Sequence, residues 1–87
     1  MQTLTVRGFV TAITAEDTTN IKYTKRTVVL CVDREETIPF VFTNENIRQI
    51  NELNLNVGDT CHITFSLRGW EYNNKFYSSL EGLSITK

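Results

Sequence analysis

Aromatic and cationic side chains alternate along residues 68–77, near the C-terminal end of the chain. Arg68, Trp70 and Tyr72 are spaced two residues apart, and so are Lys75 and Tyr77. Because alternate residues of a β-strand point to the same face, this spacing would place the side chains on one surface. The bases of a single-stranded nucleic acid stack on aromatic rings, while Lys and Arg contact its phosphates. The pattern therefore predicts a surface that binds single-stranded nucleic acid.

The dipeptide Asn73-Asn74 determines how these residues face one another. Asparagine tolerates the positive φ of a type I′ turn, so we expect a two-residue β-hairpin with a fixed register. The expected cross-strand pairs are Tyr72 with Lys75, Trp70 with Tyr77, Arg68 with Ser79, Ser66 with Glu81, Leu67 with Leu80, Phe65 with Gly82 and Glu71 with Phe76. Directly opposed residues share a face. The outer face is then expected to carry Arg68, Trp70, Tyr72, Lys75, Tyr77 and Ser79, and the core face Phe65, Leu67, Phe76 and Leu80.

Two alternatives stay open at this hairpin. Trp70 and Tyr77 could pair across the strands only to stabilise the hairpin, by about 0.5–1.5 kcal/mol beyond the burial of their area. The same aromatic face could instead be the contact site of a protein–protein interaction subunit, because Trp, Tyr and Arg are also the residue types enriched in such sites.

A second cluster of cations lies in the expected loop after the first strand and comprises Lys22, Lys25 and Arg26, with Tyr23 between them. Residues 18–32 carry a charge of +3 with no acid, and residues 33–59 carry −4 from two Arg and six acids. The net charge of −1 therefore conceals a basic loop and an acidic central segment. Since so few cations can neutralise only a few phosphates, we expect modest affinity with a strong dependence on salt.

The reactive side chains of the chain predict neither catalysis nor a metal site. Cys31 and Cys61 lie in apolar strand-like runs and are expected to be small buried hydrophobes rather than a disulfide. His62 adjoins Cys61, but the spacing is not that of zinc ligands. Glu35-Glu36 belongs to a charged turn, and no nucleophile–base pair or phosphate-binding loop occurs. We therefore expect a protein that is not an enzyme and holds no cofactor.

Frequent Thr, Val, Ile and aromatic residues, with only one Pro, indicate strands that are long and little interrupted. The expected strands are 4–15, 26–33, 37–43, 60–72 and 75–86. Residues 44–53 are expected to form a short helix, because Ile47, Ile50 and Leu53 make one apolar stripe. Thr43 or Asn44 could cap this helix. We expect bulges at Gly8, where a sharp bend is the alternative, and at Gly82, where a bulge would restore Leu83 and Ile85 to the alternation.

The order of these elements predicts an all-β, five-stranded OB-fold barrel with one short helix between the third and fourth strands. With 87 residues, the chain is expected to form a single domain over 1–87. An SH3-like barrel is the competing fold, although its helical turn usually comes later in the chain. In an OB-fold the loop after strand one and the hairpin of strands four and five flank the same groove. The basic loop and the aromatic hairpin are therefore expected to line one cleft.

Four segments resemble bacterial single-stranded-DNA-binding proteins and their small OB-fold relatives. These segments are residues 4–10 with Gly8, residues 38–42 before the helix, residues 57–59 followed by 63–68, with Gly58 and Arg68, and Tyr77-Ser78-Ser79. Residues 57–84 look closer still to a family of short stand-alone domains without an assigned function. The resemblance implies binding of single-stranded DNA, or of RNA, in replication or repair. It keeps Arg68, Trp70, Tyr72 and Tyr77 as site residues, whereas Lys22, Tyr23, Lys25 and Arg26 follow from loop geometry alone.

The sequence also departs from that family. No counterpart of the family's linker and acidic tail follows the last expected strand, and the hairpin has only two turn residues. Thr37, Pro39, Val41 and Thr43 occupy the side of the third strand where the family carries aromatics. We therefore expect a shorter site that binds more weakly.

The apolar run at Val28, Val29 and Val32 predicts a second strand that is covered on both faces. A second copy of the chain could provide one cover, and members of the similar family assemble as dimers or tetramers. Alternatively, barrel curvature and the helix could hide both faces of a monomer. No apolar run reaches the roughly 20 residues that span a bilayer, and no signal peptide is recognised, so we expect a cytoplasmic protein.

Overall fold

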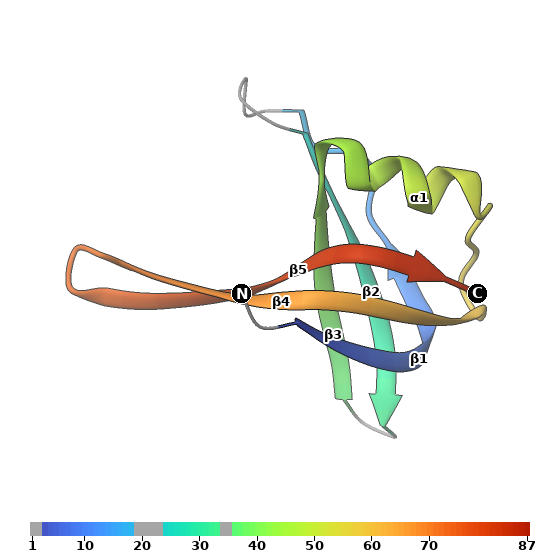
Figure 1. The fold of residues 1–87 in the computed structure, drawn as a ribbon, viewed down its shortest axis with the longest axis horizontal. Coiled ribbons are helices and arrows are strands. Elements are labelled where there is room, and N and C mark those ends of the chain that lie inside the picture. Colours follow the sequence, from blue (N-terminus) through green and yellow to red (C-terminus); the bar gives the residue numbers. More distant parts are fainter. Residues whose placement is uncertain (1–2, 19–23, 34–35) are drawn as a thin grey trace.

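The computed structural model describes residues 3–18, 24–33 and 36–87 of the chain. Its elements are β1 (Thr3–Ile13), β2 (Lys25–Asp33), β3 (Glu36–Thr43), a 3-10 turn (Asn44–Asn46), α1 (Ile47–Glu52), β4 (Thr60–Tyr72) and β5 (Lys75–Thr86). The strands close a barrel in the order β1-β2-β3-β5-β4 (Figure 1). The β3–β5 pair is parallel and the other pairs are antiparallel. The predicted OB-fold is therefore confirmed.

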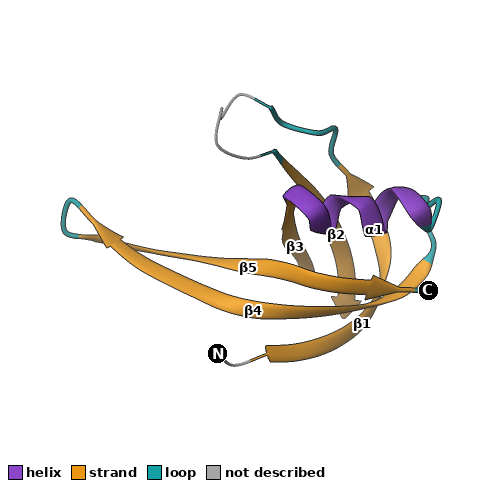
Figure 2. Ribbon diagram, turned by 45° about the horizontal axis from the view of Figure 1, so that its top comes forward, coloured by secondary structure: helices purple, strands orange, loops and turns teal. Residues whose placement is uncertain are grey.

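β1 joins the two halves of the barrel by changing its partner part-way along. Its first half pairs with β4 as far as Phe9, and its second half pairs with β2 from Phe9 onward (Figure 2). The predicted bulge at Gly8 is wrong, because the register shifts between Val10 and Ala12 instead. Gly8 is required for another reason: a Cβ there would lie 2.7 Å from the carbonyl oxygen of Cys31, so glycine lets β1 cross close to β2.

The inward-facing residues of the barrel are apolar and fully enclosed. Val28 and Leu30 of β2, Phe40 and Phe42 of β3, and Ile63 of β4 have no exposed surface. α1 lies across one end of the barrel (Figure 1) and buries Ile47 and Ile50 there. On β2 the barrel covers one face, with Val28 and Leu30 buried, while Val29 and Cys31 on the outer face stay half-buried. Barrel curvature and the helix therefore do not fully hide both faces of β2 within one copy of the chain.

The short helix begins differently from the expectation. Thr43 makes no capping hydrogen bond through its side chain, and Asn44 adopts φ 49°. The Oδ1 of Asn44 instead accepts a hydrogen bond from the backbone N–H of Thr24, at 3.2 Å. Asn44 thus ties the start of β2 to the end of β3. No helix in the described ranges is long and apolar enough to cross a membrane.

The β4–β5 hairpin is longer than the barrel and projects beyond it as an arm (Figure 1). Asn73 and Asn74 have φ of 51° and 62°, as a type I′ turn requires. Every predicted pair of the hairpin is observed, and the register shifts at Leu83, next to the predicted bulge at Gly82. Gly82 also packs directly against the ring of Phe42, where a side chain would overlap it.

The predicted burial of two hairpin residues is wrong. Leu67 and Phe76 point to the same face as the buried Phe65, but they are 58% and 82% exposed. The alternation of apolar residues correctly assigns the face of each side chain. Beyond the end of the barrel, however, no other strand covers that face. The arm therefore presents one polar, aromatic face and one apolar face to solvent.

The two cysteines are free, and they differ in environment. Cys61 is fully buried, as expected, and burial raises the pKa of its thiol above the ordinary value, with a smaller contribution from the charge of Asp59. Cys31 is only half-buried on the outer face, and its thiol donates a hydrogen bond to the backbone carbonyl of Asp33. His62 is exposed on the outer face of β4.

Candidate nucleic-acid interface

The outer face of the hairpin arm carries the aromatic side chains that the sequence pattern singled out. Trp70, Tyr72 and Tyr77 are all exposed, and Trp70 retains 51% of its surface. The rings of Trp70 and Tyr77 stack on each other, with centroids 5.8 Å apart and an angle of 17° between their planes. Tyr77 thus covers one face of the indole and fixes its orientation. The remaining indole surface is available to a further planar group.

Trp70 also lines a groove between the hairpin arm and the body of the barrel, called here the Trp70 groove. Its volume is about 530 Å³, and it is lined by Lys25, Val41, Thr43, Asn44, Trp70, Ser79 and Glu81. Lys25 begins β2, Val41 and Thr43 end β3, and the other side is formed by β4 and β5. The structure therefore brings Trp70 and Lys25 together in one concave site. Such a site presents an aromatic surface beside a cation.

The cations around the groove differ in whether they are already paired with a carboxylate. The Nε of Arg68 lies 2.6 Å from Oε2 of Glu81, so this guanidinium is already paired with a carboxylate that lines the groove. Lys25 and Lys75 make no ion pair or hydrogen bond through their side chains with any other described residue. Lys25 is thus the uncompensated cation of the groove. Lys75 pairs with Tyr72 at the tip of the arm, outside the groove lining.

Arg26 lies elsewhere, although it is adjacent to Lys25 in sequence. Neighbouring residues of a strand point to opposite faces, so only one of the two can face the groove. The Nε of Arg26 donates to the carbonyl oxygen of Thr14 at 2.8 Å, and its Nη1 donates to Oδ1 of Asn51 at 2.6 Å. Arg26 therefore links the residue that follows β1 to α1 and lines a separate cavity beside the helix. Lys22 and Tyr23 lie outside the described residues.

Sequence reasoning missed Glu81 as part of the site. The predicted register already contained the signal, because Arg68 lies opposite Ser79 and Glu81 is two residues further along the same face. Diagonal neighbours on one face of a hairpin come within reach of long side chains. The ion pair between Arg68 and Glu81 could thus have been expected. The contributions of Val41 and Thr43 depend on how the arm leaves the barrel, which the alternation of residues does not encode.

Comparison with known sequences assigns the chain to a family. Residues 5–86 match the family described as "Domain of unknown function (DUF3127)". The chain belongs to the DUF3127 family. No curated protein matches the sequence of this DUF3127 protein.

Comparison with solved structures confirms the predicted resemblance to single-stranded-DNA-binding proteins at the level of the fold. The DUF3127 chain is similar to Rim1, a mitochondrial single-stranded DNA binding protein of S. cerevisiae, with a TM-score of 0.73, 16% identity, and coverage of 98% of this chain and 92% of that chain. It is also similar to the N-terminal domain of the PriB protein from Thermoanaerobacter tencongensis, described as dimeric, with a TM-score of 0.70, 23% identity, and coverage of 97% and 92%.

Proposed function

We propose that this DUF3127 protein is a non-enzymatic module that binds single-stranded DNA. The observation that carries the proposal is the Trp70 groove, in which an exposed indole from the hairpin arm and the uncompensated ammonium group of Lys25 line one concave surface. The similarity of the fold to a mitochondrial single-stranded DNA binding protein supports it. The proposed setting is the cytoplasm, in DNA replication or repair.

In the proposed complex, bases stack on the aromatic face of the arm. Stacking on an aromatic side chain contributes about 1–3 kcal/mol per base and depends little on the sequence, because every base has a π-face. Trp70 receives one base on the indole surface that Tyr77 leaves open. Tyr72, further along the same face, provides the next aromatic ring.

The phosphates follow the cations of the same face. Lys25 contacts the backbone at the groove, and Lys75 contacts it near the tip of the arm, where it lies beside Tyr72. Arg68 reaches a phosphate only in competition with Glu81, to which it is already paired. Since about two or three phosphates are neutralised, the affinity should be modest and should fall steeply with added salt.

Trp70 is the only tryptophan of the chain, so its fluorescence reports directly on the proposed site. At low salt, titration with oligo-dT should quench the emission, added salt should restore it, and duplex DNA should compete poorly. If neither oligo-dT nor a single-stranded RNA changed the emission or bound in an independent assay, the proposed function would be wrong. Quenching by RNA alone would replace DNA by RNA as the ligand.

A protein–protein interaction subunit is the second candidate, because the arm exposes large apolar side chains on both of its faces. Trp70 and Tyr72 lie on one face, and Leu67 and Phe76 lie on the other. A stable complex with another protein that is lost on Trp70→Ala, together with no response to nucleic acid, would favour this function. A complex that survives Trp70→Ala would not use the aromatic face.

We propose in addition that the protein forms a homo-oligomer, a dimer or a tetramer. The support is the apolar strip formed by Leu4, Leu67 and Phe76, all exposed and all on the face continuous with the barrel interior. Exposed apolar surface of this kind is characteristic of sites of association. Because the strip lies opposite the aromatic face, a second copy packed there would leave the Trp70 groove open.

A further inference from the structure

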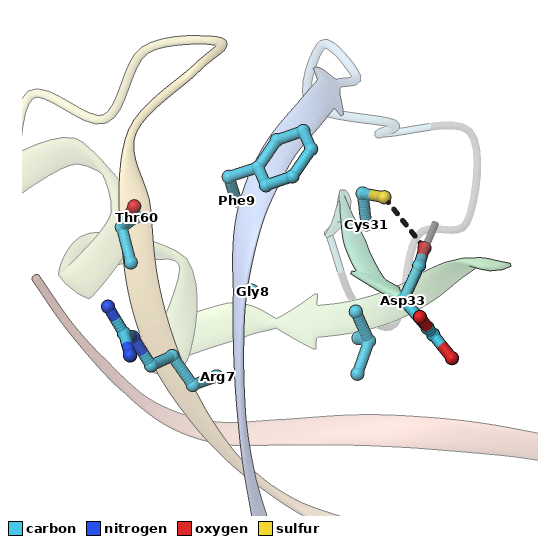
Figure 3. Close-up of a pocket in the computed structure, with 7 residues that line it drawn as sticks. Arg7, Gly8, Phe9, Cys31, Asp33 and Thr60 are labelled. Atoms are coloured by element: carbon cyan, nitrogen blue, oxygen red, sulfur yellow. Dashed lines mark hydrogen bonds between the residues drawn. The ribbon is translucent and has the colours of Figure 1, made fainter. Parts of the chain in front are cut away.

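A second hollow lies on the outer surface of the barrel, where β1 leaves β4 and joins β2. Its volume is about 510 Å³, and its lining includes Arg7, Phe9, Cys31, Asp33 and Thr60 (Figure 3). The change of partner at Phe9 explains the hollow, because β4 borders β1 on one side and β2 on the other. It is called here the Phe9 hollow.

The Phe9 hollow has the same two features as the Trp70 groove, an exposed aromatic ring and a cation without an ion pair. The side chain of Phe9 is 48% exposed, although it lies in the middle of a strand. Arg7, two residues away on the same face, is exposed and has no hydrogen bond or ion pair with any other described residue. Arg26 and Arg68, by contrast, are both engaged with neighbouring side chains. An exposed ring beside an uncompensated cation thus lines the Phe9 hollow as well as the Trp70 groove.

The two sites are connected along the outer face of β2. Lys25 stands at the groove and Cys31 at the hollow, six residues apart on the same face. That separation corresponds to about 20 Å at about 3.3 Å per residue. The outward residues between them, Thr27 and Val29, are uncharged, and so are their partners Val41 and Pro39 on β3. No carboxylate among these residues would repel a polyanion laid along the strand.

We propose that Phe9 and Arg7 form a second nucleotide-binding subsite, which takes the continuation of the single strand bound at the Trp70 groove. The inference rests on the proposed function and extends it. A base stacks on the ring of Phe9, and the guanidinium of Arg7 contacts a phosphate. Arg7 and Asp33 lie on opposite sides of β1 (Figure 3). The phosphate contact is therefore made on the Arg7 side of β1, where Thr60 also lies.

Oligonucleotides of two lengths distinguish binding at the Trp70 groove alone from binding at both sites. An oligo-dT of about 4 nucleotides can fill the Trp70 groove alone, whereas one of about 12 nucleotides, within the range that OB-folds cover, can reach both sites. Phe9→Ala should weaken binding of the longer oligomer by about 5-fold or more, as expected for one lost stacking contact, and leave the shorter one unchanged. Val57→Ala, which also truncates an exposed apolar side chain, should change neither.

Arg7→Gln tests the phosphate contact without removing the ring. For the longer oligomer, the slope of log affinity against log salt should decrease in magnitude by about 0.7, the value for one phosphate of a single strand. The matched control is Arg48→Gln on α1, which removes an exposed cation outside both sites. Arg48→Gln should leave the difference in this salt slope between the longer and the shorter oligomer unchanged.

Cys31 gives a measurement on the unmodified protein. Its thiol lines the Phe9 hollow and is partly exposed, whereas Cys61 is fully buried with a raised pKa and should not react. The longer oligomer should slow alkylation of Cys31, and the shorter one should not. This readout does not depend on whether a variant folds.

Several results would overturn the subsite. One is equal affinity of Phe9→Ala and the unmodified protein for the longer oligomer, with Cys31 alkylated at an unchanged rate. Another is a folded Phe9→Ala variant whose affinity for the longer and for the shorter oligomer falls by the same factor, which would indicate a single site. A change of oligomeric state on Phe9→Ala, seen by sedimentation, would make the hollow a protein interface. Failure of the unmodified protein to bind either length would instead refute the proposed function itself.

Discussion

Trp70 makes a contact within the arm and also lines the groove, and its removal should therefore affect stability and binding differently. It stacks on Tyr77 within the arm, and it lines the groove that also contains Lys25. The first contact involves only the arm, which projects beyond the barrel (Figure 1). The barrel core is formed by other residues, so the fold should not depend on Trp70. Binding, by contrast, should depend on it strongly.

Trp70→Ala should therefore weaken binding of single-stranded DNA by about 5- to 150-fold, corresponding to the loss of one stacked base. Anisotropy of a labelled oligonucleotide measures the affinity, and circular dichroism during heating measures the melting temperature. Trp70→Phe should restore most of the affinity, because the phenyl ring also stacks. Wholesale unfolding of Trp70→Ala would instead show that the indole serves hairpin packing alone.

Glu81 places a negative charge in a groove that is proposed to accept a polyanion. Glu81→Gln keeps the size of the side chain, removes this charge and releases Arg68 from its ion pair. Affinity for single-stranded DNA at low salt should rise about 2- to 5-fold, and the salt dependence should become steeper. The side chains of Arg68 and Glu81 are 50% and 26% exposed, so the pair is screened by solvent and the free energy of unfolding should change by less than about 1 kcal/mol. Unchanged or weaker binding would place the phosphate path away from Arg68.

Glu71→Gln is the matched control for that measurement. Glu71 is an exposed acid on the same arm, but it pairs with Phe76 on the opposite face. The two variants have the same net charge, so only their position differs. A gain in affinity confined to Glu81→Gln would assign the effect to the groove rather than to the overall charge of the protein.

At the scale of elements, the hairpin shows how far sequence patterns reach. The turn at Asn73-Asn74 fixed in advance the pairs of β4 with β5 from Tyr72 with Lys75 to Phe65 with Gly82, because positive φ at both positions leaves one register up to the shift at Leu83. The alternation of side chains along each strand then assigned Trp70 and Tyr77 to one face. This alternation does not show where the barrel ends, so it could not predict that Leu67 and Phe76 lie beyond that end and are exposed. The same rule, applied to β2, would have separated Lys25 from Arg26.

Contacts between segments that are distant in the sequence are the second feature of the fold that the residue pattern does not predict. Gly8 was expected to mark a bulge or a sharp bend; the bulge lies elsewhere, and the glycine serves the close approach of β1 to the carbonyl of Cys31. A glycine within a strand is compatible with either role, and only the position of the neighbouring strand distinguishes them. The groove depends likewise on the distance between the arm and β3, which emerges only when the barrel closes.

Gly82 and Gly69 offer a matched pair on β5 and β4. A Cβ at Gly82 would overlap the ring of Phe42, which is fully buried, so Gly82→Ala should lower the free energy of unfolding by about 1–3 kcal/mol. A Cβ at Gly69 would lie 3.7 Å from the carbonyl oxygen of Tyr77, an ordinary contact. Gly69→Ala should therefore be neutral, or stabilising by up to about 1 kcal/mol. Urea denaturation of both variants measures the difference, and equal stability would contradict the packing argument.

At the scale of the whole molecule, the two faces of the arm separate association from ligand binding. Trp70 faces the groove, while Leu67 and Phe76 extend the apolar face of the barrel into solvent. If a second copy covers the apolar face, replacing Leu67 and Phe76 by Ser should convert the oligomer to a monomer. Because the aromatic face is untouched, the monomer should still bind a short oligonucleotide with the affinity of the unmodified protein. Sedimentation velocity measures the first effect and anisotropy the second. A monomeric unmodified protein would refute the homo-oligomer, and loss of short-oligonucleotide binding in a folded double variant would show that the two faces are not independent.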